Sequence, residues 1–175
     1  MSEWGSRMPE CSHPVFGDDT VGTKYRFEPM SDWQARAVAD WRYDPPYDFY
    51  DAVADPGDLA ELLDSEQRGD RYFAVLDGFG ELVGFFAFRC EADAVEIGLG
   101  LRPDLTGRGL GLPYLLAGLE FARERYAPAR FRLAVAAFNQ RAISVNERAG
   151  FCRGTSYPHW TNGAEHEFLR MERPA

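Results

Sequence analysis

The sequence predicts an α/β (α+β) domain built on a mixed, mostly antiparallel sheet of six to seven strands, flanked by about four helices. Three features lead to this prediction: several short strand patterns in the first half, a long amphipathic helix in the middle, and a strand–helix–strand unit around it. A chain of 175 residues with 45% hydrophobic residues can bury one core but is short for two domains. We therefore expect one domain over residues 23–175, preceded by an irregular N-terminal extension over residues 1–22.

The first half of the domain carries signals for two helices and four strands. Ser31 and Asp32 are N-cap residues for a helix with Trp33, Ala37, Val38 and Trp41 on one stripe. Two prolines then end any helix inside the aromatic loop 42–51. A turn over residues 77–80 joins two strand patterns and predicts a hairpin. The expected strands are residues 24–27, 72–76, 82–89 and 95–101, and the second helix is 58–65.

The second half alternates between helix and strand. A helix over residues 109–126 places an apolar face on one side, a helix over 141–149 ends at Gly150, and strands are expected over 130–137, 151–155 and 167–172. The apolar face consists of Leu112, Leu115, Leu116, Leu119 and Ala122. The aromatic residues Tyr157, His159 and Trp160 are predicted to lie in a loop.

Charge and cysteine content exclude several classes of protein. The net charge of −9, with 28 acidic against 19 basic residues, argues against a nucleic-acid surface. The three cysteines are far apart and contain no CxxC pair, so no metal site is expected. Neither a signal peptide nor a long apolar segment is apparent, which predicts a cytoplasmic protein that does not interact with membranes. The acidic surface indicates solubility, or attraction of a cationic substrate.

A glycine-rich segment joins the strand over 95–101 to the long helix. Gly107, Gly109 and Gly111 alternate with other residues just where the helix opens. Such a loop lets the backbone approach a ligand, and the free N–H groups and dipole of a helix start favour a diphosphate. Glycines of this kind can also be purely structural. The spacing matches neither GxGxxG nor the P-loop, which disfavours a Rossmann dehydrogenase and a P-loop kinase.

Two motifs resemble those of the GNAT acetyltransferases. The acetyl-CoA loop of that family reads Arg/Gln-x-x-Gly-x-Gly/Ala, and here it falls on Thr106, Gly109 and Gly111, with Thr106 in place of Arg or Gln. The family's helix motif Asn-x-x-Ala-x-x-x-Tyr-x-x-x-Gly-Phe matches residues 139–151, except that Asn146 replaces the Tyr. The resemblance implies a GNAT fold with splayed fourth and fifth strands, direct acetyl transfer from acetyl-CoA to an amine, and, as in many members, a homodimer.

The resemblance also assigns the cofactor-binding residues. Leu99, Gly100 and Leu101 would meet the pantetheine arm, and Asn139 would lie near its thiol end. The diphosphate would bind the loop residues Gly107, Arg108, Gly109, Leu110, Gly111 and Leu112. Asn139 also suits an ordinary helix N-cap, and both roles can coexist.

Glu96 is the candidate general base. In the strand over 95–101, Glu96 shares a face with Gly98 and Gly100, which leaves space beside its carboxylate for a substrate. Several GNAT enzymes place a base at this position. The alternative is a solvated Glu on a polar strand face. Asn146 cannot supply the acid for the departing thiolate, so either another hydroxyl such as Tyr157 serves or the thiolate leaves unassisted.

The acceptor is expected to be a small-molecule or peptide amine. In this fold the first two helices and their loop wall the acceptor groove, so Trp41, Tyr43, Tyr47 and Tyr50 are candidates for substrate binding. These aromatic residues would otherwise pack the loop over the core. A second hypothesis, based on Thr106 and Asn146, is a non-catalytic acyl-CoA-binding regulatory module.

Overall fold

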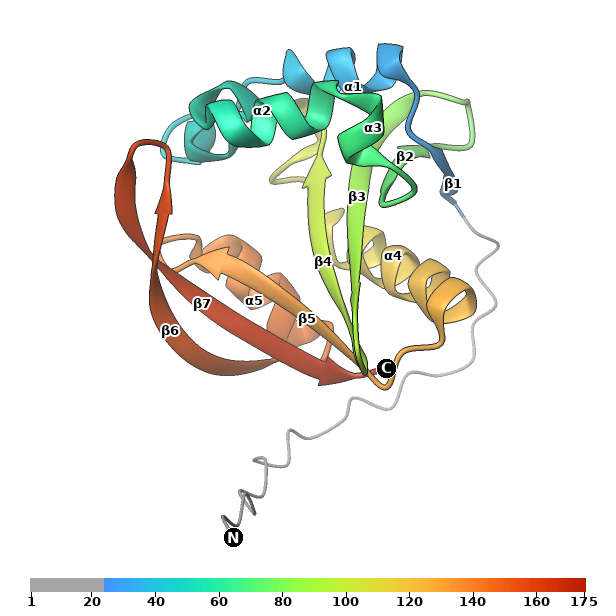
Figure 1. The fold of residues 1–175 in the computed structure, drawn as a ribbon. Helices are drawn as coiled ribbons and strands as arrows, with labels where there is room; N and C mark the ends of the chain where they lie inside the picture. Colours follow the sequence, from blue (N-terminus) through green and yellow to red (C-terminus); the bar gives the residue numbers. More distant parts are fainter. Residues whose placement is uncertain (1–23) are drawn as a thin grey trace, which may run out of the picture.

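The computed structural model describes residues 24–175, and the predicted extension over residues 1–22 lies outside this part. The domain contains seven strands and five α-helices in the described residues (Figure 1). In chain order the elements are β1 Arg26–Pro29, α1 Asp32–Ala39, α2 Pro56–Leu63, α3 Ser65–Arg68, β2 Tyr72–Leu76, β3 Leu82–Glu91, β4 Ala94–Leu101, α4 Gly111–Tyr126, β5 Arg130–Ala136, α5 Gln140–Arg148, β6 Cys152–Thr161 and β7 Ala164–Pro174. Short 3₁₀ turns lie at Tyr47–Tyr50, Ala52–Ala54 and Pro103–Leu105.

The sheet has the strand order β1-β2-β3-β4-β5-β7-β6, and among the strands of residues 24–175 only β4 and β5 pair in parallel. That pair is short, running only from Ala94 opposite Arg130 to Glu96 opposite Arg132. After Glu96, β4 continues to pair with β3, while β5 pairs with β7. The two strands therefore separate into a wedge (Figure 1). This confirms the predicted fold class and its splayed fourth and fifth strands.

Two apolar clusters hold the layers together. The larger cluster joins α4 and α5 to the sheet and includes Leu115, Phe131 and Ile143, all almost fully buried. The smaller cluster joins α1 and α2 to β2 and β3 through residues such as Val38 and Leu62. Burial of apolar surface of this kind contributes about 25 cal/mol per Å² and is the main stabilising term. The helices thus cover the two faces of the sheet.

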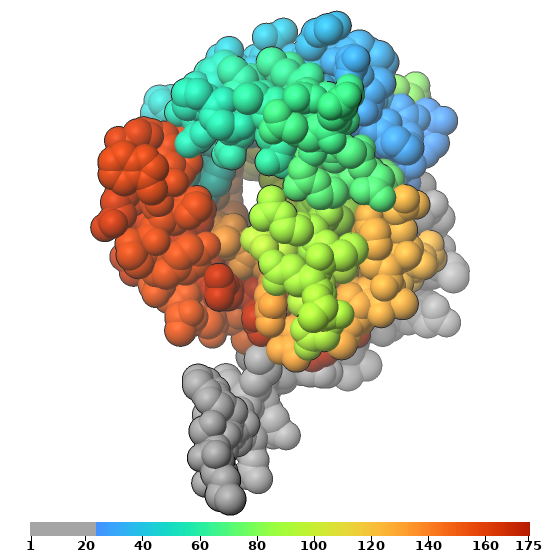
Figure 2. All heavy atoms as spheres, viewed as in Figure 1, coloured from blue at the N-terminus to red at the C-terminus, as the bar shows by residue number. Residues whose placement is uncertain are grey.

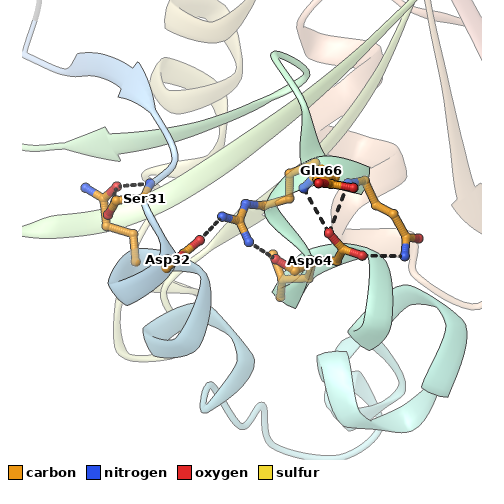
Figure 3. A network of polar contacts seen from close by, with 8 residues as sticks. Ser31, Asp32, Asp64 and Glu66 are labelled. Atoms are coloured by element: carbon orange, nitrogen blue, oxygen red, sulfur yellow. Dashed lines mark hydrogen bonds and ion pairs between the residues drawn. The ribbon is translucent and has the colours of Figure 1, made fainter.

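Polar contacts tie the three N-terminal helices to one another (Figure 3). Arg68 at the end of α3 is only 3% exposed, forms an ion pair with Asp32 of α1 and donates to the carbonyl of Leu62 in α2 at 2.6 Å. The Asp64 carboxylate caps α3 by accepting from the Glu66 N–H at 2.9 Å. A buried guanidinium requires such partners. These contacts fix the helices that flank the wedge.

The predicted apolar stripe of the first helix is correct for Ala37, Val38 and Trp41, which lie in or against the smaller apolar cluster, but wrong for Trp33. Trp33 is 62% exposed, and the buried residues of α1 are Gln34, Ala35, Val38 and Ala39. Gln34 can be buried because its side chain is satisfied: its Oε1 accepts from the Ser31 N–H and its Nε2 donates to Glu28 at 2.7 Å. This capping box starts the helix at Ser31, as the sequence predicts.

The predicted loop around Tyr157, His159 and Trp160 is a strand. These residues belong to β6, which forms a long hairpin with β7 and places His159 opposite His166. Asn162 and Gly163 make its turn with φ values of 53° and 74°. An Asn-Gly pair favours a tight hairpin turn because both central residues need positive φ. The pair Asn162-Gly163 therefore predicts this hairpin, and the loop was expected only because of the neighbouring aromatic residues.

The close approach of α4 to the sheet leads to a stability prediction. A Cβ on Gly118 would lie 2.2 Å from the ring of Phe86, which is fully buried and cannot move aside. We expect Gly118→Ala to lower the free energy of unfolding by about 1–3 kcal/mol, although alanine favours helices by about 1 kcal/mol. Urea unfolding measures the change.

Gly78→Ala is the control, because nothing lies within 4 Å of its Cβ position. Its stability should stay close to that of the parent protein. Equal stability of the Gly118 and Gly78 variants would contradict the packing of α4 on β3.

Candidate active site

The wedge between β4 and β5 is bordered by the C-terminal hairpin and the N-terminal helices. Figure 2 shows an opening between the red C-terminal hairpin, the blue-green helices α2 and α3, and the yellow-green strands β3 and β4. The tip of the hairpin closes this ring by contacting the start of α2. The Asp55 carboxylate accepts from the Asn162 N–H at 3.0 Å and from the Thr161 hydroxyl at 3.2 Å. The Asn162 amide also donates to the carbonyl of Phe49 at 2.9 Å.

The same Asp55 carboxylate is the N-cap of α2, where it accepts from the Gly57 N–H at 2.8 Å. Backbone hydrogen bonds, the one from Asn162 foremost, hold the pKa of Asp55 below its usual range. A depressed pKa in the folded state adds stability above the unfolded value of about 3.9, and this stability is lost as the pH falls through the folded pKa. The contact between hairpin and helix should therefore weaken only in acid.

Asp55→Ala tests this contact. We expect it to lower the free energy of unfolding by about 1 kcal/mol, as for a lost N-cap, and to speed hydrogen exchange in the turn between β6 and β7. Asp64→Ala is the matched control, because Asp64 caps α3 through a similar carboxylate and its hydrogen bonds all go to Glu66 and Gln67. Equal exchange rates of the hairpin in the two variants would contradict the closure.

The glycine loop lies at the mouth of the wedge. Gly107 and Gly109 have φ values of 72° and 76°, which side chains disfavour. In the described residues, no hydrogen bond uses a backbone N–H from Gly107 to Leu112, and no side chain caps α4. Thr106 donates to the carbonyl of Pro103 at 2.8 Å and so stabilises the turn before the loop. The loop therefore presents unpaired N–H groups at a helix N-terminus, an arrangement that suits a diphosphate.

Arg141 adds a positive charge beside the loop. A Cβ placed on Gly107 would lie 3.8 Å from a guanidinium nitrogen of Arg141, and that guanidinium stacks 4.0 Å from the centre of the Tyr47 ring. A cavity of about 370 Å³ lies here, and its lining residues are Arg42, Tyr43, Asp44, Pro45, Tyr47, Pro103, Asp104, Thr106 and Arg141. Arg141 was not predicted from the sequence as a site residue, although it lies only two residues after Asn139, which was.

Of the four predicted substrate residues, three tyrosines reach the wedge from the loop between α1 and α2. The Tyr43 hydroxyl donates to the carbonyl of Leu101 at 2.9 Å, and Tyr50 accepts from the Ala136 N–H at 3.2 Å. Tyr47 lies under Arg141 as described. Trp41 instead packs against Phe85 in the smaller apolar cluster. The tyrosines thus bridge the loop to both strands that form the wedge.

Glu96 lies at the apex of the wedge, since it is the last residue of β4 that pairs with β5. Its direct neighbours across the sheet are Arg89 on β3 and Arg132 on β5, whose side chains share its face. Arg132 is engaged by Glu172 at 2.6 Å and by Glu91 at 3.2 Å. The structure gives neither Glu96 nor Arg89 an ion pair within the described residues.

Beyond Glu96, the predicted pantetheine residues Leu99, Gly100 and Leu101 line the separated part of β4. Leu99 is 38% exposed, which fits a strand that has lost its neighbour on one side. Gly100 lies close to Phe85, because a Cβ there would be 2.3 Å from the ring. The strand therefore offers a partly open edge to an extended ligand.

Asn139 and Asn146 have separate positions on α5. Asn139 is the N-cap of the helix, and its Oδ1 accepts from the Ala142 N–H at 3.0 Å. Asn146 is 5% exposed and its amide contacts the sulfur of Met171 at 3.7 Å. The residue in the usual Tyr position is therefore packed against β7.

The separated parallel pair, the glycine loop and the helix that follows define the fold class of the CoA-dependent N-acetyltransferases. A family model described as "Acetyltransferase (GNAT) family" matches residues 28–151. The chain belongs to this family. Acetyl-CoA is the acyl donor of the family, and the unpaired N–H groups of the loop fit its diphosphate.

Solved structures share the fold. A spermidine N-acetyltransferase SpeG chimera from Vibrio cholerae and hSSAT superposes with a TM-score of 0.71 at 18% identity, covering 87% of this chain and 96% of that one. Spermidine N-acetyltransferase from Vibrio cholerae in complex with CoA and spermine gives 0.69 at 17% identity, covering 86% and 95%. A GNAT-family acetyltransferase from Bacillus anthracis gives 0.68 at 16%, covering 86% and 95%. No curated protein matches the chain.

Metal-binding groups and membrane-spanning helices were searched for in residues 24–175 only. No group of His, Cys, Asp or Glu in residues 24–175 is arranged to hold a metal ion. None of the helices in this part is long and apolar enough to cross a membrane.

Proposed function

We propose that the protein is an N-acetyltransferase that moves the acetyl group of acetyl-CoA directly to a primary amine of a small molecule or a protein. The observation that carries this proposal is the alignment of three features along one wedge: unpaired N–H groups at its mouth, an open β4 edge along its side, and Glu96 at its apex. A thioester bound along β4 with its diphosphate on the loop would carry its acetyl group toward Glu96.

On the cofactor side, the loop residues 107–112 hold the diphosphate, and Arg141 adds charge to it. Leu99, Gly100 and Leu101 pair with the pantetheine arm, with Asn139 near its thiol end. Two contacts hold the loop between α1 and α2 over the cofactor side of the wedge. Arg141 stacks on Tyr47, and Tyr43 donates to the carbonyl of Leu101. Tyr43 and Tyr47 therefore serve the cofactor side rather than the acceptor.

Glu96 is proposed as the general base. An alkylamine with a pKa of about 10.4 is less than about 0.1% neutral at pH 7, so forming the nucleophile costs about 4–5 kcal/mol. A carboxylate at the apex lowers this cost by accepting the proton, directly or through water.

The acceptor approaches from the side of the hairpin. A shallow hollow of about 270 Å³ lies on this hairpin, lined by Ser156, Tyr157, Pro158, Glu165, His166 and Glu167. Its carboxylates and aromatic rings suit a cationic amine. The structurally similar Vibrio cholerae enzyme is named for spermidine and was solved in complex with spermine. Polyamines are therefore the first amines to test as acceptors.

A non-catalytic acyl-CoA-binding regulatory module is the second candidate. The buried Asn146 favours it, because the usual tyrosine of α5 is absent from the wedge. Such a module would bind acetyl-CoA without transferring the acetyl group.

The deciding experiment incubates the purified protein with acetyl-CoA and a panel of polyamines, amino acids, aminoglycosides and peptide N-termini, and follows release of CoA thiol. We expect release that depends on one class of amine. Binding of acetyl-CoA with no release from any amine would favour the regulatory module, and absence of binding would contradict both candidates. Cytoplasmic location and a homodimer stay predictions, checked by cell fractionation and light scattering.

A further inference from the structure

We propose that Tyr50 donates the proton to the departing CoA thiolate and so replaces the tyrosine that α5 lacks. This inference rests on the proposed function. It concerns which hydroxyl group completes the transfer and where that group is held.

The first argument is the position of Tyr50. It comes from the loop between α1 and α2, 86 residues away from β5 in sequence, yet its hydroxyl lies 3.2 Å from the backbone nitrogen of Ala136. Ala136 ends β5, beyond the point where β4 and β5 separate. The ring of Tyr50 also packs against Phe49 and Phe138. The phenol is thus fixed on the β5 side of the wedge.

The second argument is the state of the hydroxyl proton. Tyr50 accepts a hydrogen bond from the Ala136 N–H and another from the Asn139 amide. Asn139 is free to donate because its oxygen already accepts from Ala142. Within residues 24–175, no group accepts the hydroxyl proton of Tyr50 in a hydrogen bond. Tyr43 differs, since its proton is given to the carbonyl of Leu101.

The third argument is that these surroundings favour a proton donor. Partial burial raises the pKa of Tyr50, and the two hydrogen bonds it accepts oppose that effect only in part. The phenol is therefore protonated at neutral pH. After it gives up the proton, the Ala136 N–H and the Asn139 amide stabilise the phenolate.

Tyr157, the other hydroxyl considered from the sequence, has different neighbours. Its ring lies near His159 and Phe168 of the hairpin, and the Arg170 guanidinium lies 5.3 Å from its centre. These contacts are all within β6 and β7. None of them joins Tyr157 to β5 or to Asn139.

The proton balance of the step is complete. The amine nitrogen forms a bond to the thioester carbon and loses its proton to Glu96 or to water. When the C–S bond breaks, its electron pair goes to sulfur, and the Tyr50 O–H proton passes to that sulfur. Solvent then takes the proton from Glu96 and returns one to the phenolate, so that the enzyme is restored and CoA thiol and the N-acetylated amine are the only products.

Tyr50→Phe tests the assignment, with Tyr126→Phe at the end of α4 as the control. We expect a fall in kcat of about a hundredfold at pH 7, with the acetyl-CoA dissociation constant nearly unchanged and a lower unfolding midpoint, because the buried Ala136 N–H loses its acceptor. The control should keep the parent kcat. An unchanged kcat in Tyr50→Phe, or weaker acetyl-CoA binding that accounts for the whole loss, would overturn the proposal.

A measurement without turnover separates this proposal from the proposed function. Fluorotyrosine placed at position 50 reports its surroundings by ¹⁹F NMR. We expect its resonance to shift with CoA and to shift less with desulfo-CoA, which lacks the sulfur. Equal shifts with both ligands would show that Tyr50 does not meet the sulfur, even if the parent enzyme transfers acetyl groups. No response to either ligand, together with no CoA binding, would instead count against the proposed function.

Discussion

Replacing Glu96 by Gln is expected to lower kcat by about a thousandfold while acetyl-CoA binding stays the same. Gln has nearly the shape of Glu but cannot accept a proton, and general base catalysis contributes about 10²- to 10⁴-fold. The carboxylate lies at the apex of the wedge, away from the glycine loop, so the binding of the diphosphate should not change. Steady-state kinetics at saturating amine and calorimetric titration of acetyl-CoA give the two quantities.

The pH dependence sharpens this test. In Glu96→Gln the rate should rise with pH only as the amine itself loses its proton, because no carboxylate is left to accept that proton. Glu81→Gln in the exposed turn before β3 removes the same charge elsewhere and should behave like the parent. A Glu96 variant with full kcat would show that water alone serves as the base.

Replacing Gly109 by Trp should weaken acetyl-CoA binding by at least about a hundredfold, which corresponds to about 2.7 kcal/mol. Nothing lies within 4 Å of the Cβ position of Gly109, so an indole there extends into the space proposed for the diphosphate. Its φ of 76° adds about 1–2 kcal/mol of backbone strain for any residue other than glycine. Calorimetry with acetyl-CoA measures the loss.

Gly80→Trp separates strain from lost binding. Gly80 has a φ of 84° and equally open surroundings, but it lies in the turn between β2 and β3. Both variants should be destabilised to a similar extent, and only the Gly109 variant should lose affinity. Equal acetyl-CoA affinity in the two variants would place the diphosphate elsewhere.

The sequence predicted the parts of the fold that depend on local patterns. The turn at residues 77–80, the apolar face around Leu115 and Leu119, and the N-cap at Asn139 each follow from residues close together in the chain. The glycine loop was found for the same reason, because Gly107, Gly109 and Gly111 are adjacent to the helix that they start. Fold class and family could therefore be predicted before any coordinates.

The remaining features of the site depend on contacts between distant residues. Tyr50 meets Ala136 across 86 residues, and Asp55 meets Asn162 across 107. No periodicity or spacing encodes such pairs, since they form only when β5 and the hairpin are placed by the sheet. The burial of Gln34 was missed for a related reason, because its burial depends on a partner at Glu28.

Mass spectrometry of the products tests the central claim most directly. The purified protein is incubated with acetyl-CoA and the amine that promotes thiol release, and the N-acetylated amine is quantified beside free CoA. The account predicts equal amounts of the two, with both lost in Gly109→Trp. Free CoA without acetylated amine would mean thioester hydrolysis, and absence of both with every amine tested would contradict a transferase.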